Sequence, residues 1–396
     1  MKKEEEFLEI AEEHIFSMGL PDSGTRLCLS NMKFGLAKIH HWQRKMGLSP
    51  LATFIATPDA TVTRNRSRWD SGFGYGGKVS WGKGDQEVVF LEVKPNSCGM
   101  LVGGLERLPT ENELLERVDS FQKKSSYSRG VKLEWDFSQG NHFIEVFSVR
   151  PKEQISLPPR VFIIHGSASE LKDDSAMGYG LYWNDSSRLR QEAQVMRTPF
   201  GSLYLLEGKK ALDYLEFYRF ADGFSKEKRK LVADHLFGNF HLVSNETHQG
   251  MLNCNEVLLG CHYIRDTDTL YPLTLRADIP SYLLIGKRNL KDRIIKTLQF
   301  DQKAREWGTY QRLSCANVLP HGGGYVFPQI SKIERIYRLK GKRYFRVVSP
   351  EGSKTIFSNI RGMPYQYRSK EVLDKTVELN LGEVVAELYP LWTIQV

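Results

Sequence analysis

Histidine and cysteine side chains lie beside glycines, or where strand-like runs end, at several points of the sequence. The stretch "GNHFIEVF" adds Asn141, His142 and Glu145 to an apolar run, and these three groups are costly to bury without partners. His165 ends the run "RVFIIH", and "KPNSCGM" places Cys98 in a predicted turn. Strand ends and turns are where proteins usually present catalytic and metal-binding groups.

Two further glycine-containing motifs carry histidines, His248 in "VSNETHQG" and His321 in "LPHGGGY". Imidazole and thiolate are ligands suited to Zn, Mn, Fe or Co, and a catalytic metal site keeps one coordination position open for substrate. The spacing between these motifs is long and irregular, so a metal site and a set of separate structural histidines remain alternatives. The five cysteines include no CxxC pair, which argues against a disulfide framework and a zinc finger.

The elements that must position these groups are strands and helices in irregular order. Short apolar runs rich in Val, Ile and Phe predict strands at 87–93, 142–149, 160–165, 281–286 and 344–348. Apolar residues at helical spacing predict helices over 2–19, 111–124, 186–197, 209–235 and 289–305. Because strands and helices mix without strict alternation, we expect an α+β fold.

The net charge of +8 is compatible with a polyanionic partner but does not require one. Two basic clusters, "RNRSRW" with Arg64, Arg66 and Arg68, and "KEKRK" over Lys226 to Lys230, are candidates for an RNA path; the alternative is solvated surface charge. No apolar run reaches about 18 residues, and the acidic first residues lack the apolar core of a signal peptide. We therefore expect a cytoplasmic protein with no membrane partner.

Taken in order, "CGMLVGG", "GNHFIEV", "IHGSAS", "THQG" and "PHGGG", followed by "RGMPYQYRSKEVLDK" and the ending "VVAELYPLWTIQV", resemble the RtcB family of GTP- and Mn²⁺-dependent RNA ligases. The match runs from about residue 70 to the C-terminus and is poor over the first 60 residues. It implies an N-terminal helical segment over 1–60 and a catalytic domain over 61–396. In that domain, mixed sheets with surrounding helices enclose a central metal-containing cleft.

The resemblance also implies the metal ligands and the nucleophile. Cys98 would bridge two Mn²⁺ ions, with Zn²⁺ or Fe²⁺ as alternatives; His142 would bind one ion, and His165 and His248 the other. His321, which opens "HGGG", matches the histidine that becomes guanylylated. The glycines after it let the backbone approach a phosphate closely.

The nucleotide site implied by the resemblance comprises Asn141, Phe143, Glu145, Ser281, Gly323, Tyr367 and Gln395. In the family the Asn contacts the guanylate phosphate, the Phe packs near the base and the Glu reads the base by hydrogen bonding. Strand alternation puts Asn141, Phe143 and Glu145 on one face and His142 on the other, unless the strand start bends.

The sequence departs from the family pattern at four positions. Pro95 stands where the family has an aspartate ligand, and Glu92 is the nearest carboxylate that could replace it. Tyr325 replaces an arginine after the glycines, and Gln395 replaces a C-terminal lysine that reaches the nucleotide. Ser281 is the closest remnant of a glycine- and serine-rich nucleotide loop.

We therefore expect an RNA ligase for RNA repair or tRNA splicing, with GTP as cofactor and RNA as partner. It would join RNA 3′-phosphate or 2′,3′-cyclic phosphate ends to 5′-hydroxyl ends. A metal-dependent phosphodiesterase or nuclease without nucleotidyl transfer, and a catalytically silent RNA-binding homologue, remain alternatives. Whether a helper protein is needed is left open.

Overall fold

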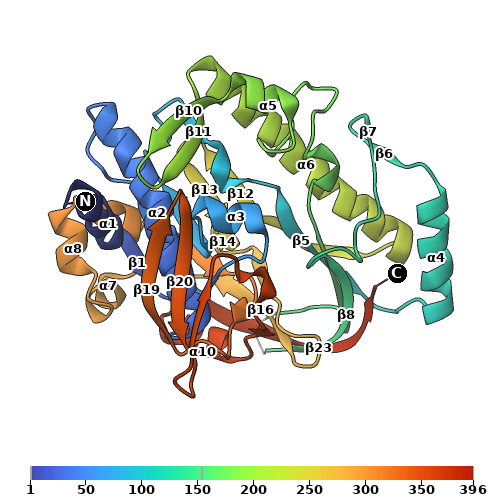
Figure 1. Ribbon diagram of the computed structural model, residues 1–396. Helices are drawn as coiled ribbons and strands as arrows, with labels where there is room; N and C mark the ends of the chain where they lie inside the picture. Colours follow the sequence, from blue (N-terminus) through green and yellow to red (C-terminus); the bar gives the residue numbers. More distant parts are fainter. Residues whose placement is uncertain (1, 153–154, 396) are drawn as a thin grey trace.

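The computed structural model describes residues 2–152 and 155–395, and an eleven-stranded sheet forms its centre (Figure 1). In spatial order the sheet contains β1 (Ile15–Ser17), β2 (Thr53–Thr61), β3 (Tyr75–Ser80), β13 (Glu256–Leu259), β12 (His241–Asn253), β5 (Cys98–Leu105), β9 (Arg160–Gly166), β8 (Phe143–Pro151), β23 (Gly382–Ile394), β16 (Ser281–Gly286) and β15 (Leu270–Leu273). The β1 and β2 pair is parallel, and the other neighbouring strands pair antiparallel.

The middle of this sheet is buried on both faces, which explains why its strands read as continuous apolar runs. Every residue of β5 is buried, and β9 is buried from Val161 to Gly166. On one face Phe162 stacks on Phe237 from a long helix, with ring centroids 3.9 Å apart. Glycines in β5 make room for such large neighbours, so the strand accepts close packing that a side chain would prevent.

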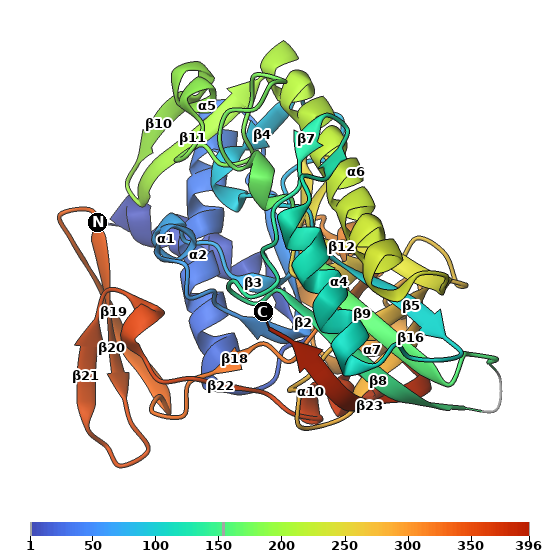
Figure 2. The same ribbon diagram turned by 90° about the vertical axis from the view of Figure 1, so that its right-hand side faces the viewer.

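Helices cover the sheet and its edges. They are α1 (Lys2–Glu13), α2 (Ser23–Lys45), α3 (Arg66–Ser71), α4 (Glu111–Lys123), α5 (Ser187–Glu192), α6 (Lys209–Phe237), α7 (Asp292–Thr297), α8 (Asp301–Glu306), α9 (Tyr310–Ser314) and α10 (Glu371–Glu378). The long helix α6 packs against β5, β9 and β12, and α4 lies alongside it (Figure 2). Helix α2 packs against β2, and Asp22 caps its first turn by accepting a hydrogen bond from the Thr25 amide.

Smaller sheets surround the centre. They are β10 (Gln194–Thr198) with β11 (Gly201–Glu207) and β4 (Val88–Phe90); β14 (Cys261–Tyr263) with β17 (Val318–Pro320); β18 (Tyr325–Val326) with β22 (Gln366–Tyr367); β19 (Lys332–Leu339) with β20 (Lys342–Val348) and β21 (Lys354–Phe357); and β6 (Tyr127–Ser128) with β7 (Val131–Lys132). The sheet of β19, β20 and β21 stands beside the body of the molecule in Figure 2.

The prediction of an α+β fold is confirmed. Some predicted helices are shorter than expected: the first ends at Glu13 because a strand follows it, and the helix predicted over 289–305 is two helices, α7 and α8. Among the described residues, no helix is both long and apolar enough to cross a membrane.

The N-terminal segment differs from the expected helical segment over 1–60. It contributes β1 and β2 to the central sheet, and β2 continues past residue 60 to Thr61. All nine residues of β2 are buried, and Phe54 shares one hydrophobic core with Ile394 near the other end of the chain. The apolar and β-branched run "TFIAT" favours a strand here. The division at residue 60 therefore falls inside a central strand.

Candidate metal centre

Antiparallel pairing brings the polar strand ends to one end of the central sheet. Cys98 is the first residue of β5, and His165 lies near the end of its neighbour β9, where it faces Met100 in the register. Directly opposite residues in an antiparallel pair point to the same face, so Cys98, Met100 and His165 share one face. Strand β8 starts at this same end, and β23 finishes there.

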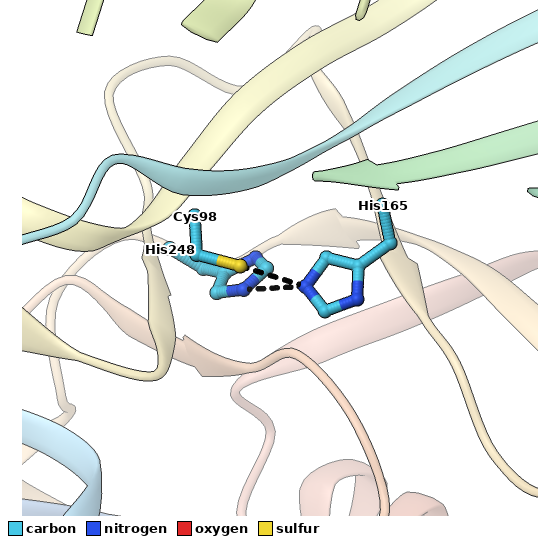
Figure 3. A group of neighbouring side chains, drawn as sticks. All are labelled: Cys98, His165 and His248. Atoms are coloured by element: carbon cyan, nitrogen blue, oxygen red, sulfur yellow. Dashed lines mark hydrogen bonds between the residues drawn. The ribbon is translucent and has the colours of Figure 1, made fainter. Parts of the chain in front are cut away.

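Cys98, His165 and His248 form a buried cluster (Figure 3). The Cys98 Sγ lies 3.0 Å from His165 Nε2, and the two Nε2 atoms of His165 and His248 lie 3.3 Å apart. One candidate ligand atom from each residue lies within 4.8 Å of the others. His142 Nε2 lies 3.9 Å from the Cys98 Sγ, so the sulfur has imidazole nitrogens from three histidines around it.

His248 reaches the cluster because of a bulge in β12. In the pairing with β5, Thr247 is opposite Gly99 and Gln249 is opposite Cys98, so His248 is the additional residue between two consecutive pairs. A bulge re-aims the side chain of the inserted residue, which explains how His248 joins the face of Cys98.

Oxygen atoms beside the other ring nitrogens fix which nitrogen faces the cluster. The Nδ1 of His165 donates to the Asn141 carbonyl oxygen over 2.7 Å, which leaves its Nε2 as a lone-pair donor to a metal. His142 Nδ1 lies 3.0 Å from Asp136 Oδ2, so its Nε2 is likewise the nitrogen that faces the sulfur. A carboxylate or carbonyl behind a histidine is the usual companion of a metal-binding imidazole.

The charge state of Cys98 also suits a metal. Burial alone would raise the pKa of the thiol, but the imidazole of His165 and hydrogen bonds from the surrounding histidines hold the pKa well below its usual value. The thiolate is the form that binds metals. One thiolate and two imidazoles are ligand types that could hold a transition-metal ion.

Helix α6 packs behind the cluster and buries two of the four cations of "KEKRK", Lys228 and Arg229, so these two do not lie along a surface RNA path. Lys226 and Lys230 keep accessible side chains, and their place on an RNA path stays a prediction. Arg229 is fully buried, and its guanidinium donates to the Gly166 carbonyl oxygen over 3.0 Å, one residue after His165. Lys228 is also buried and pairs with Asp136 over 2.9 Å and Glu170 over 2.8 Å. Charge alone did not reveal this burial, because the partners of Lys228 and Arg229 come from distant segments.

A cavity of about 310 Å³ opens beside the cluster. Except for Ser281, it is lined by every residue predicted for catalysis and nucleotide binding: Asn141, Phe143, Glu145, His321, Gly323, Tyr367 and Gln395. Two of the predicted metal ligands, His142 and His165, line it as well. Strand β8 starts at Phe143, so Asn141 and His142 lie in the turn before it and are not bound by strand alternation. The bend at the strand start therefore brings both faces of "NHFIEV" to one cavity.

His321 is held by Asp59, a residue that the sequence reasoning missed. The Nδ1 of His321 lies 2.8 Å from Asp59 Oδ2, and this oxygen also accepts from the His321 amide over 3.1 Å. Burial alone would raise the pKa of Asp59, but hydrogen bonds from His321 and from the Thr57 hydroxyl keep it below its usual value. The His321 Nε2 is left with the free lone pair, and the ring centroid lies 4.4 Å from that of His248.

The glycines after His321 have a defined structural role. Gly324 has φ +66°, and a Cβ there would lie 2.5 Å from the Asp59 carbonyl oxygen. A side chain at this position would therefore push the loop away from the strand that holds Asp59. Asp59 itself sits in the buried run "TFIATPDAT", and an acidic residue inside an apolar strand was the signal that could have identified it.

Glu145 is a buried carboxyl among the cavity residues and is 4% exposed. Among the described residues, the one hydrogen-bond partner of its carboxyl is the Thr393 hydroxyl, which donates over 3.4 Å from β23. Burial raises the pKa of the carboxyl to about 7. The group therefore changes charge near neutral pH, where it can accept or donate a hydrogen bond to a bound base.

A second cavity of about 590 Å³ shares the wall formed by Tyr75, Asn141, His142, Tyr325 and Tyr367. Its other lining residues include four cations, namely Arg64, Arg68, Lys94 and Lys172. The "RNRSRW" cluster thus contributes two arginines to a cavity beside the metal cluster. Its remaining arginine, Arg66, pairs with Asp70 on the surface.

Glu92 and Ser281 are not brought to the cavity. The Glu92 carboxylate pairs with Lys38 Nζ over 2.5 Å and accepts from the Tyr204 amide, so the proposed replacement for the missing aspartate ligand is wrong. The residues 91–93 form a 3-10 turn, η1 (Leu91–Val93), that turns this side chain toward α2. Ser281 accepts a hydrogen bond from the amide of Leu275, which does line the cavity.

The fold and site define an α+β protein with a buried Cys and His cluster beside two polar cavities. No protein-family model matches the chain, and no curated protein matches it closely enough to count as a relative.

Proposed function

We propose that the protein is a metal-dependent RNA ligase that uses GTP and a guanylylated His321. The observation that carries the proposal is the position of His321: its Nδ1 is held by Asp59, and its ring borders both the Cys and His cluster and the nucleotide-sized cavity. A neutral imidazole with one nitrogen fixed by a carboxylate is an activated nucleophile.

In the first step His321 Nε2 attacks the α-phosphorus of GTP. A nitrogen–phosphorus bond forms, the bond to the bridging oxygen breaks, and pyrophosphate leaves with that electron pair. The guanylate then passes to an RNA 3′-phosphate, which frees His321. Finally a 5′-hydroxyl attacks the activated 3′-phosphate, forms the new phosphodiester and displaces GMP.

Cys98, His165 and His248 would hold one metal ion, and His142, from the other side of the sulfur, is the candidate for a second. A bound ion at this place neutralises phosphate charge and lowers the pKa of a bound hydroxyl group. Tyr367 and Phe143 line the wall where a base can pack, and Glu145 offers the acceptor that a guanine edge needs. The basic cavity with Arg64 suits the RNA phosphate.

The test is covalent labelling with α-³²P-GTP, and with α-³²P-ATP in parallel, in the presence of Mn²⁺. We expect an acid-labile label from GTP on the wild type. The label should be absent from His321→Ala and present on His241→Ala, which removes an exposed histidine of β12. If metal-loaded protein takes no label from either nucleotide, the ligase proposal fails.

A second candidate function is a metal-dependent phosphodiesterase without nucleotidyl transfer. Two observations favour it: the cluster has three close protein ligands, which leaves a coordination position for a substrate phosphate, and the C-terminal side chain at the cavity is the uncharged Gln395. RNA cleavage that needs Cys98 and survives in His321→Ala would support this function instead.

A further inference from the structure

We propose that the outer face of the β19, β20 and β21 sheet binds single-stranded RNA. Its charge is the first feature that supports RNA binding. The segment 332–357 contains eight Lys and Arg residues and two Glu residues, so it carries +6 of the chain's net charge of +8. Arg338 and Arg343 turn toward the body of the protein, and the remaining six cations of the segment still outnumber its two Glu residues. Such an excess of cations on one element is typical of a nucleic-acid surface.

The inner face of this sheet anchors it to the body of the protein. Phe345 and Val347 of β20 are buried in the main core, and the Phe345 ring lies 4.8 Å from that of Trp69 on α3. Arg343 reinforces the contact by donating to the Trp69 carbonyl oxygen over 2.6 Å. The sheet is therefore held in a defined orientation, with its other face turned outward.

Strand register places tyrosines and arginines together on the outer face. Tyr337 is directly opposite Tyr344, and Arg335 is directly opposite Arg346. The guanidinium groups of Arg335 and Arg346 lie 5.1 Å and 5.6 Å from the centroid of the Tyr337 ring. Glu334 pairs with Arg346, and among the described residues Arg335 has no carboxylate partner.

Two tyrosines in opposite register positions, one of them beside two guanidinium groups, suit unpaired bases and their phosphates. Bases of a single strand can stack on aromatic faces while cations follow the backbone, whereas a duplex hides its base faces. A surface that binds any polyanion would require the cations but not the two tyrosines. The chemistry therefore favours a single strand over a duplex or an anionic membrane.

The sheet is also joined to the cavity at both of its ends. Strand β18 precedes it and β22 follows it, and these two strands pair with each other through Tyr325 and Tyr367, which line both cavities. The residues 327–331 between β18 and β19 can span at most about 20 Å. Figure 2 shows β18 and β22 between the sheet and the centre of the molecule. An RNA strand whose end lies in the cavity can therefore continue onto this face, an inference that rests on the proposed function.

The first test measures the dissociation constant for a 12-nucleotide single-stranded RNA with a 3′-phosphate, by fluorescence anisotropy. Stacking predicts that Tyr337→Ala/Tyr344→Ala binds at least about tenfold more weakly and that Tyr337→Phe/Tyr344→Phe binds like the wild type. The matched control Tyr127→Ala/Tyr389→Ala removes two exposed tyrosines of other strands and should bind unchanged. Equal affinity in all variants would overturn the proposal.

The second test measures how the affinity depends on salt. Arg335→Gln/Lys342→Gln removes two cations of the outer face, so the slope of log affinity against log salt should fall by about 1.4. The control Lys123→Gln/Lys124→Gln removes two exposed cations at the end of α4 and should keep the wild-type slope. Binding of a 12-base-pair duplex, or of vesicles containing phosphatidylserine, that depends on the same tyrosines would assign the face to another partner and overturn the proposal.

Failure of the ligase proposal is distinguishable from failure of this one. Tyrosine-dependent RNA binding without any label on His321 would leave the RNA surface in place and refute only nucleotidyl transfer. Labelled His321 together with an RNA affinity that is unchanged in the tyrosine variants would support nucleotidyl transfer and refute only the RNA surface.

Discussion

Because the carboxyl of Glu145 is buried, we expect the free energy of unfolding to fall as the pH rises. Burial raises the pKa of this group to about 7 from its ordinary value of 4.5. A raised carboxyl pKa means that the folded state favours the neutral form. The contribution to stability is present below pH 4.5 and is lost as the pH rises through about 7. Glu145→Gln mimics the neutral form, so it should remove this loss.

The size of the effect follows from the two pKa values. Each pKa unit is worth about 1.4 kcal/mol. The raised pKa therefore lowers the free energy of unfolding by roughly 3 kcal/mol at pH 8.5 and by under about 1 kcal/mol at pH 5. With an unfolding entropy of about 2.1 cal/mol/K per residue, the free energy of unfolding of a chain of 396 residues falls by roughly 0.8 kcal/mol per degree near the melting temperature. Glu145→Gln should therefore raise Tm by about 4 °C at pH 8.5 and by about 1 °C at pH 5.

The assay is differential scanning calorimetry of metal-free wild type and Glu145→Gln in the presence of a chelator. Glu116→Gln, an exposed position on α4, is the matched control and should leave Tm unchanged at both pH values. An equal Tm difference between Glu145→Gln and wild type at pH 5 and pH 8.5 would refute the reasoning, because the gain must come from the charge.

Three further predictions concern the cluster and the nucleophile. Cys98→Ala should lose bound metal, measured by elemental analysis after gel filtration, whereas Cys315→Ala, which changes an exposed cysteine, should keep it. Asp136→Asn should weaken metal affinity by roughly 10–100-fold in chelator competition, because the carboxylate behind His142 orients that ring; unchanged affinity would exclude this role. Asp59→Asn should keep the metal content and slow labelling by GTP at least about 100-fold, since the imidazole loses the partner that fixes its Nδ1 proton.

The sequence predicted correctly the strands and motifs that depend on local residue patterns. Strands such as β16 at residues 281–286 match their predicted bounds because apolar runs bounded by glycine or proline are local signals. The histidine motifs were found because polar groups interrupt such runs. The cavity brings together most of the residues assigned from the motifs, although the functional roles given to them stay predictions.

The features that the sequence could not supply depend on contacts between distant segments. Asp59 meets His321 across 262 positions of the chain. The position of His248 depends on a bulge whose register is set by the partner strand β5. The burial of Lys228 follows from its carboxylate partners, Asp136 and Glu170, on other segments. Glu92 was misjudged for the same reason, since its partner is on α2.

The cluster places polar groups where an apolar core would be more stable. Cys98 is 3% exposed and His248 is fully buried, and the His248 Nδ1 has no hydrogen-bond partner among the described residues. A buried thiolate is costly unless a cation compensates its charge. A bound metal compensates that charge in the folded state only, so it stabilises the fold by mass action as its concentration exceeds its dissociation constant. The same groups that weaken the metal-free protein would therefore make metal binding favourable, and the buried central strands β5 and β9 hold Cys98 and His165 close enough to receive an ion.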